Sequence, residues 1–227
     1  MRHDGRRPDE GRAIRIETGF QKGPDGSVLI TVGETKVICS AYAQSGVPSF
    51  LAGSGKGWVT AEYAMLPGAG QTRTRREHTA GGRSQEIQRL IGRSLRAVTR
   101  LEALGEQTIA IDCDVLQADG GTRTAAISGS FVALALALKR MADMGLVDGQ
   151  PFTDTVQAIS VGLVDGRLLA DLCYVEDVRA EVDMNVVLTG SGRLIEVQGT
   201  AEHAPFTVAQ LGDLVALAAK AAEPIVA

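Results

Sequence analysis

The spacing of apolar residues along the chain separates stretches with a period of two from stretches with a period near 3.6. The first kind predicts β-strands and the second predicts α-helices. Predicted strands cover residues 27–32, 35–43, 58–65, 108–116, 156–164, 168–173, 181–188 and 194–198. Predicted helices cover residues 84–104, 124–144 and 207–222. This order of elements predicts an α+β fold in which helices pack on mixed β-sheets.

The first two predicted helices differ in their outer faces. The helix over residues 84–104 has one apolar stripe, and arginines recur at steps of four, three and four on its other side. These are Arg89, Arg93, Arg96 and Arg100. Such a row is most often a solvated face. The helix over residues 124–144 is apolar nearly all round, which indicates burial between layers. No linker rich in proline and serine divides the chain, so we expect residues 1–227 to form a single domain.

Composition and charge restrict the classes of protein that are possible. The chain has 227 residues, 44% of them hydrophobic, which is enough for a substantial core. Its net charge is −4, so it is not a basic nucleic-acid protein overall. The charge is uneven, however: residues 1–72 carry +1, residues 73–100 carry +6 and residues 101–227 carry −11. This distribution suggests polyanion contact on one side and metal or acid chemistry on the other.

Cysteine spacing and hydropathy indicate the compartment. Cys39, Cys113 and Cys173 lie far apart and form no CxxC pair, so neither a zinc cluster nor a disulfide framework is expected. The first residues are charged and lack the apolar stretch of a signal peptide. The longest apolar run, residues 131–138, is too short to span a membrane. We therefore expect a cytoplasmic protein that has no membrane association.

The junction between the strand over residues 108–116 and the helix that follows it is the most informative local feature. It contains Gly120, Gly121, Thr122 and Arg123. Two glycines allow the backbone to approach a ligand closely, and the first N–H groups of a helix have no partner within it. The helix dipole and Arg123 add positive charge, which favours an anion, phosphate above all. The alternative is that Thr122 or Thr124 merely caps the helix.

Two carboxylates form a second candidate site. Asp183 lies early in an apolar strand, where an acid costs free energy unless it is paired, hydrogen-bonded or bound to metal. Asp177 lies six residues earlier, across an expected bend that can bring the two carboxylates together. Such a pair would suit Mg²⁺, which prefers a few oxygen ligands and keeps some of its waters. The alternative is a turn residue, Asp177, followed by a solvent-facing strand residue, Asp183.

Several longer motifs carry a family resemblance. The chain resembles the ribonuclease PH family of phosphate-dependent 3′ exoribonucleases over essentially its whole length. The motifs are MRHDGR (1–6), GSVLITVGETKVICSA (26–41), GKGWVTAEYAMLP (55–67), EIQRLIGRSLRAV (86–98), IDCDVLQADGGTRTA (111–125), EVDMNVVLTGSGR (181–193) and EVQGTAE (196–202). The resemblance implies a ββαβα-type fold and a homohexameric ring of three dimers. It also implies an activity on tRNA precursors and other RNA 3′ ends, with orthophosphate as the nucleophile.

The resemblance also implies roles for particular residues. Phosphate binding falls on Arg83, Gly121, Thr122 and Arg123. The catalytic and metal-binding acids are Asp177 and Asp183, with Mg²⁺ as the expected ion. Arg73 and Arg76 are the residues expected to grip tRNA. Relatives commonly have arginine where this chain has Gly68, a loss for which Arg75 can compensate.

Three other functions remain possible from the sequence. The chain could be an inactive ring subunit that only binds RNA, although Arg83, Arg123, Asp177 and Asp183 are all retained. It could be a small-molecule kinase, although the glycine-rich residues 53–57 lack the upstream Gly and the Ser or Thr of a P-loop. It could be a hydrolytic metal nuclease that uses Asp112, Asp114 and Asp119.

Overall fold

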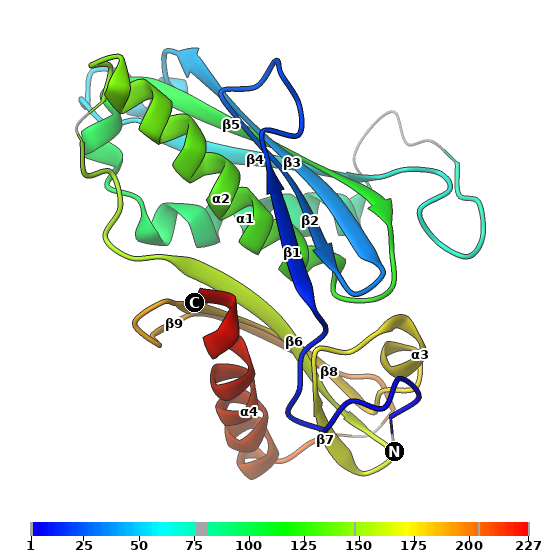
Figure 1. The fold of residues 1–227 in the computed structure, drawn as a ribbon. Coiled ribbons are helices and arrows are strands. Elements are labelled where there is room, and N and C mark those ends of the chain that lie inside the picture. Colours follow the sequence, from blue (N-terminus) through cyan, green and yellow to red (C-terminus); the bar gives the residue numbers. More distant parts are fainter. Residues whose placement is uncertain (1, 76–80, 148, 204, 227) are drawn as a thin grey trace.

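The computed structural model describes residues 2–75, 81–147, 149–203 and 205–226. Two β-sheets lie one above the other, with two helices between them (Figure 1). The first sheet has the order β1-β2-β3-β5-β4. Its strands are β1 (Ile14–Thr18), β2 (Gly26–Val32), β3 (Thr35–Ser45), β4 (Trp58–Met65) and β5 (Gln107–Gln117). All neighbours in this sheet are antiparallel except β4 and β5, which are parallel. The predicted mixed sheet is therefore confirmed.

The second sheet is antiparallel and has the order β7-β6-β8-β9. Its strands are β6 (Val156–Val164), β7 (Arg167–Ala170), β8 (Val182–Thr189) and β9 (Leu194–Ala201). Asp165 and Gly166, with φ of 49° and 70°, close the tight hairpin between β6 and β7. The helix α4 (Val208–Val226) contacts β6, β7 and β8 of this sheet, where it buries Leu214, Ala218 and Ala222.

Helix α2 (Thr122–Asp143) lies between the sheets and contacts β2 and β3 on one side and β6 on the other. Its small and apolar residues, such as Ala126, Ile127 and Ala133, are fully buried, as the sequence predicted. The helix is long and apolar enough to cross a membrane, but 61% of its most apolar stretch is buried inside the protein. Its apolar character is thus explained by contact with two sheets.

The structure differs from the predicted elements in four places. Helix α1 (Gly82–Val98) is shorter than predicted, because Thr99 leaves the helix to bridge Phe152 and a separate turn, η2 (Leu101–Leu104), follows. Strand β1 was not predicted, because its pattern is weak and its pairing with β2 stabilises it. The short helix α3 (Tyr174–Asp177) was also not predicted. A further turn, η1 (Ser49–Leu51), precedes β4.

Candidate active site

The start of α2 has the features of an anion site. Gly120 and Gly121 both have left-handed φ angles, 75° and 64°, and Gly121 is the N-cap without any side-chain cap. The hydroxyl of Thr124 donates to the carbonyl of Gly121 (2.9 Å), and that of Thr122 accepts from the Tyr63 hydroxyl (2.8 Å). The alternative that Thr122 or Thr124 caps this helix is therefore wrong. Within the described ranges, no group accepts a hydrogen bond from the backbone N–H of Thr122 or Arg123.

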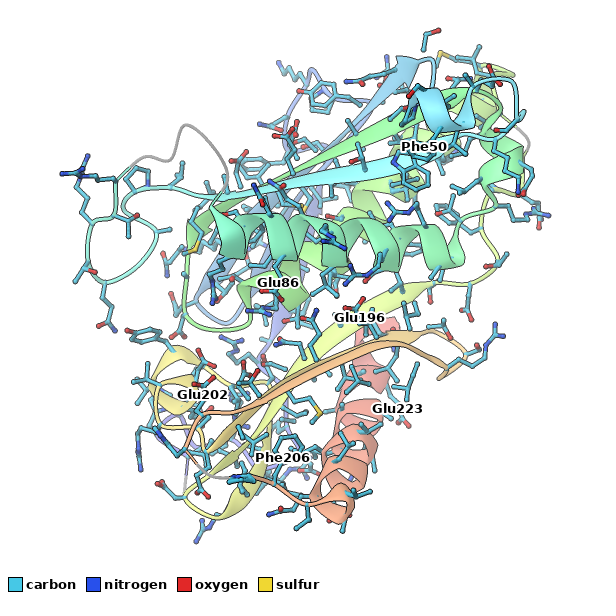
Figure 2. All side chains as sticks on the ribbon, turned by 180° about the vertical axis from the view of Figure 1, so that it is seen from behind. Phe50, Glu86, Glu196, Glu202, Phe206 and Glu223 are labelled. Atoms are coloured by element: carbon cyan, nitrogen blue, oxygen red, sulfur yellow. The ribbon has the colours of Figure 1, made fainter. Side chains whose placement is uncertain are left out.

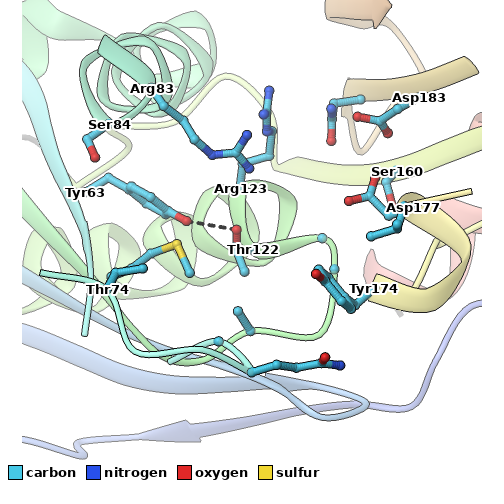
Figure 3. A pocket seen from close by; sticks show the side chains of 18 of the residues that line it. Tyr63, Thr74, Arg83, Ser84, Thr122, Arg123, Ser160, Tyr174, Asp177 and Asp183 are labelled. Carbon is cyan, nitrogen blue, oxygen red and sulfur yellow. Dashed lines mark hydrogen bonds between the residues drawn. The ribbon is translucent and has the colours of Figure 1, made fainter. Parts of the chain in front are cut away.

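Two arginines from different helices reach the same space. Arg83 stands in the first turn of α1 and Arg123 in the first turn of α2, and both side chains line the same cavity (Figure 3). The Arg83 side chain is exposed. Among the described residues, the Arg123 side chain hydrogen-bonds only to Glu86 (3.4 Å) and Gln198 (3.5 Å), both at long distances. Such loosely held guanidinium groups can exchange their present contacts for a phosphate, which they can bind with two hydrogen bonds.

The two acids face these arginines across the cavity (Figure 3). Asp177 ends α3, and Asp183 is the second residue of β8. The chain between them turns through Val178 and Ala180, which confirms the bend expected from the sequence. Both side chains are half-buried, so the alternative of a solvent-facing Asp183 is wrong, although Asp177 does lie where the chain turns. Among residues with described positions, neither carboxylate has a hydrogen-bond or ion-pair partner, as a site waiting for a ligand requires.

Burial and mutual repulsion make these acids hard to ionise. Burial, and secondly the neighbouring Asp177, raise the pKa of Asp183 to about 6, although Arg123 opposes the shift. Burial also raises the pKa of Asp177, whereas Arg83 and Arg123 lower it. The arginines therefore act on both acids, which places all four side chains within one electrostatic neighbourhood.

The four side chains line one cavity of about 720 Å³. Tyr63, Asn185, Glu202 and His203 also line it, and the sequence analysis gave none of them a role. Buried Tyr63 holds the Thr122 hydroxyl in place. Tyr63, Asn185 and Glu202 lie within the family motifs, which was their only visible signal, whereas His203 lies outside them. All four reach the cavity through strand pairing or loop placement, which no local pattern shows.

The predicted RNA-binding arginines lie on a loop beside the cavity. The loop between β4 and α1 is held by a hydrogen bond from the Thr74 N–H to the Pro67 carbonyl (2.9 Å). Arg75 lines the cavity, whereas exposed Arg73 lines a separate hollow with Gly68. Arg76 lies outside the described residues. The structure thus brings Arg75, but not Arg73, to the cavity.

The structure does not support two of the alternative functions. Lys56, in the glycine-rich segment over residues 53–57, pairs with Glu102 (2.7 Å) and does not line the cavity. Of the three other acids, Asp114 alone reaches the cavity, while the Asp119 carboxylate accepts from the Tyr174 N–H (3.3 Å). In the described part of the chain, no set of three close metal-ligating atoms includes Asp112, Asp114 or Asp119.

Comparisons with known proteins identify the family of the chain. The model of the 3′ exoribonuclease family, domain 1, matches residues 10–139, and the model of domain 2 matches residues 154–221. A ribonuclease PH from Syntrophomonas wolfei is 57% identical over 229 residues, which cover 100% of this chain and 96% of the relative. A ribonuclease PH from Bacillus subtilis is 55% identical over 230 residues, which cover 100% and 94%.

A solved structure shows the same fold. The chain superposes on a subunit of the Archaeoglobus fulgidus exosome, a structure described as having RNA bound to the active site. The TM-score is 0.82 at 20% identity, and the match covers 99% of this chain and 91% of the other. At that identity the likeness concerns the fold alone. The two family models and the full-length identity decide the family: this chain belongs to the ribonuclease PH group of the 3′ exoribonuclease family.

Proposed function

We propose that this chain removes nucleotides from the 3′ ends of tRNA precursors, using orthophosphate as the nucleophile and releasing nucleoside diphosphates. One observation supports the proposal above all. A helix start without a side-chain cap and two loosely held arginines face two acids that have no partner among the described residues, within one cavity. This arrangement provides separate places for an attacking anion and for the ester that it attacks.

The cationic side neutralises the nucleophile. Orthophosphate and an RNA phosphodiester repel each other, so the reaction needs positive charge where they meet. Arg83 and Arg123 supply two full charges, and the backbone N–H groups of Thr122 and Arg123 supply fixed donors. Donors of this kind lower a barrier by about 3–4 kcal/mol each when they are aimed at developing charge.

The acidic side fits a divalent cation. Asp177 and Asp183 present carboxylate oxygens that have no described partner, which is the ligand chemistry that Mg²⁺ prefers. A bound Mg²⁺ would neutralise charge on the oxygens of the transferred phosphoryl group. Burial raises the pKa of both acids. We propose that one of the two holds Mg²⁺ and that the other, in its protonated form, gives its proton to the departing 3′ oxygen.

The RNA is held by the arginine-rich segment over residues 73–76. Arg75 is placed to contact phosphates next to the cavity, and we propose Arg73 and Arg76 as contacts further along the acceptor stem. Only 4% of the residues are aromatic, so the protein should contact the phosphate backbone of the RNA rather than stack on its bases. Such binding weakens steeply as the salt concentration rises.

The assembly and the compartment are part of the proposal. We propose a homohexameric ring built from three dimers, which the family resemblance implies. Two solved structures that share this fold are archaeal exosomes, which supports an assembly of several subunits. We also place the enzyme in the cytoplasm. Its three cysteines are buried and unpaired, as a reducing compartment allows.

Product analysis tests the reaction. A tRNA precursor with a labelled 3′ extension should release nucleoside diphosphates only when orthophosphate is present. Release of nucleoside monophosphates at the same rate without phosphate would refute the proposal. Arg167, which is exposed on β7 and does not line the cavity, provides a control substitution for tests of Arg83 and Arg123.

A further inference from the structure

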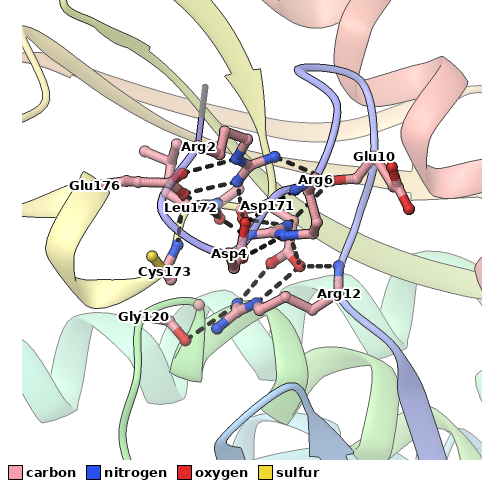
Figure 4. A network of polar contacts seen from close by, with 12 residues as sticks. Arg2, Asp4, Arg6, Glu10, Arg12, Gly120, Asp171, Leu172, Cys173 and Glu176 are labelled. Atoms are coloured by element: carbon pink, nitrogen blue, oxygen red, sulfur yellow. Dashed lines mark hydrogen bonds and ion pairs between the residues drawn. The ribbon is translucent and has the colours of Figure 1, made fainter.

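A buried network of charges joins the two sides of the cavity from behind. The N-terminal segment over residues 2–12 crosses from the second sheet to the first (Figure 1). Its arginines meet Asp171, which precedes α3, and Glu176, which lies within α3 (Figure 4). The network contains Arg2, Arg6, Arg12, Asp171 and Glu176. These charges do not line the cavity, so neither phosphate nor RNA needs to touch them.

The Arg12 guanidinium has two sides, and each holds a different part of the protein. On one side, Asp171 accepts from the Arg12 backbone N–H (2.7 Å), from Nε (2.9 Å) and from Nη2 (2.6 Å). On the other side, Arg12 donates to the carbonyls of Asp119 and Gly120. The Arg12 and Asp171 side chains are only 6% and 7% exposed, so water does not compete with these bonds.

The turn that carries Gly120 is therefore held from behind. Besides Arg12, the Thr35 hydroxyl donates to the Gly120 carbonyl (2.7 Å), and the same hydroxyl accepts from the Asp119 N–H (2.9 Å). These bonds leave the front of the turn, where α2 begins, open to the cavity. The orientation of the uncapped N–H groups thus depends on Arg12 and Thr35.

The acid-bearing helix is held by the same network. The Glu176 carboxylate accepts from Arg2 Nε and Nη2 (both 2.7 Å) and from the Cys173 N–H (3.2 Å). Arg2 also donates to the Asp171 carbonyl (3.0 Å). Glu176 immediately precedes Asp177, so the bonds that hold Glu176 also orient α3 and its catalytic acid.

The turn that carries Gly120 and the segment that leads into α3 are in direct backbone contact. A Cβ atom on Gly120 would lie 2.5 Å from the Leu172 carbonyl oxygen. Asp171, directly before Leu172, has a φ of 52°, a left-handed conformation that few residues other than glycine adopt. The hydrogen bonds to Arg12 stabilise this strained residue. A change in the Arg12–Asp171 pair would therefore move the phosphate turn and the acid helix relative to each other.

We propose that Arg12 and Asp171 are positioning residues that set the separation between the phosphate turn and the acid helix α3. The inference rests on the proposed phosphorolytic function, because only that reaction needs a phosphate and an RNA ester held together. A displacement of about 1 Å between reacting groups can cost about 100-fold in rate. Lysine cannot replace Arg12, because it lacks the planar fork that bonds to both sides at once.

The test is steady-state phosphorolysis by Arg12→Lys with the full-length protein and a 3′-labelled RNA at saturating concentration. We expect the KM for orthophosphate to rise and kcat/KM for orthophosphate to fall by about 100-fold. RNA affinity without phosphate should stay within twofold of the unmodified protein. Loss of folded enzyme lowers the apparent kcat but leaves the phosphate KM unchanged, so the KM reports positioning rather than stability. Arg179→Lys, in an exposed pair with Asp165, is the matched control and should change nothing.

A second variant covers the case in which Arg12→Lys does not fold. Arg12→Gln combined with Asp171→Asn removes both charges of this pair together. Arg6, which also pairs with Asp171, keeps its ion pairs with Asp4 (2.6 Å) and Glu176 (3.7 Å). The double variant should fold and show the same rise in phosphate KM. An unchanged phosphate KM in either folded variant would overturn the inference while the unmodified enzyme remained phosphorolytic. Phosphate-independent cleavage by the unmodified enzyme would refute the proposed function instead.

Discussion

Replacing Asp183 by Asn should make the protein more stable while it stops turnover. Burial and Asp177 raise the pKa of the Asp183 carboxyl from 3.8 to about 6. Each unit of pKa shift corresponds to about 1.4 kcal/mol, so ionised Asp183 costs the fold about 3 kcal/mol. Asparagine has the same shape and carries no charge, so Asp183→Asn should remove this cost.

The sign of the pH dependence follows from the raised pKa. The folded state binds the Asp183 proton more tightly than the unfolded state does. Protonation of Asp183 therefore stabilises the fold, and this contribution is complete below the ordinary pKa of the carboxyl. It is lost as pH rises through about 6. Asp183→Asn should therefore gain about 3 kcal/mol in free energy of unfolding near pH 8, and about half of that near pH 5.

Urea denaturation at both pH values measures this difference, at one protein concentration and without added phosphate or divalent cations. Asp213→Asn is the matched control, because Asp213 is exposed on α4, and its effect should stay within about 0.5 kcal/mol. A variant that is no more stable than the unmodified protein near pH 8, or a gain that does not change with pH, would show that Asp183 is not held in an unfavourable environment. Normal turnover by the variant would reject its catalytic role.

Three further predictions concern other parts of the site. Arg123→Ala should lower kcat/KM for orthophosphate by about 10- to 100-fold, because it removes charged hydrogen bonds; an unchanged phosphate dependence would exclude Arg123 from the phosphate site. Arg73→Ala and Arg75→Ala should each reduce the slope of log affinity for tRNA against log salt by about one unit, and equal slopes would exclude phosphate contacts. Calorimetry should show one cooperative unfolding transition if residues 1–227 form a single domain, and two separated transitions would refute that prediction.

Much of the fold follows from local patterns. The strand β5 alternates Ile109, Ile111, Cys113 and Val115 toward the core, and these residues are almost completely buried. Helix α2 is apolar on most of its circumference because it contacts both sheets. The limits of α1 could not be predicted, because the helix ends where Thr99 pairs with Phe152, a residue far along the chain. Tertiary pairing overrides local propensity there.

The candidate site, too, has features that follow from local sequence and features that depend on tertiary packing. Gly120, Gly121 and Arg123 are neighbours in the chain, so an anion site at the start of a helix could be inferred from them alone. The spacing of Asp177 and Asp183 allowed a close pair but did not require one. Their raised pKa values depend on how deeply β8 and α3 are packed, and burial is a property of the folded chain.

The sequence by itself determined most of the elements, the family and the candidate residues for phosphate binding, because periodicity, turn chemistry and extended motifs are local properties. Only the tertiary structure decided that Arg83 and Arg123 converge from two helix starts, and that Arg12 reaches an acid 159 positions away. Contacts over such distances depend on how sheets and helices stack. The separation between the phosphate turn and the acid helix is therefore set by packing that no short stretch of sequence encodes.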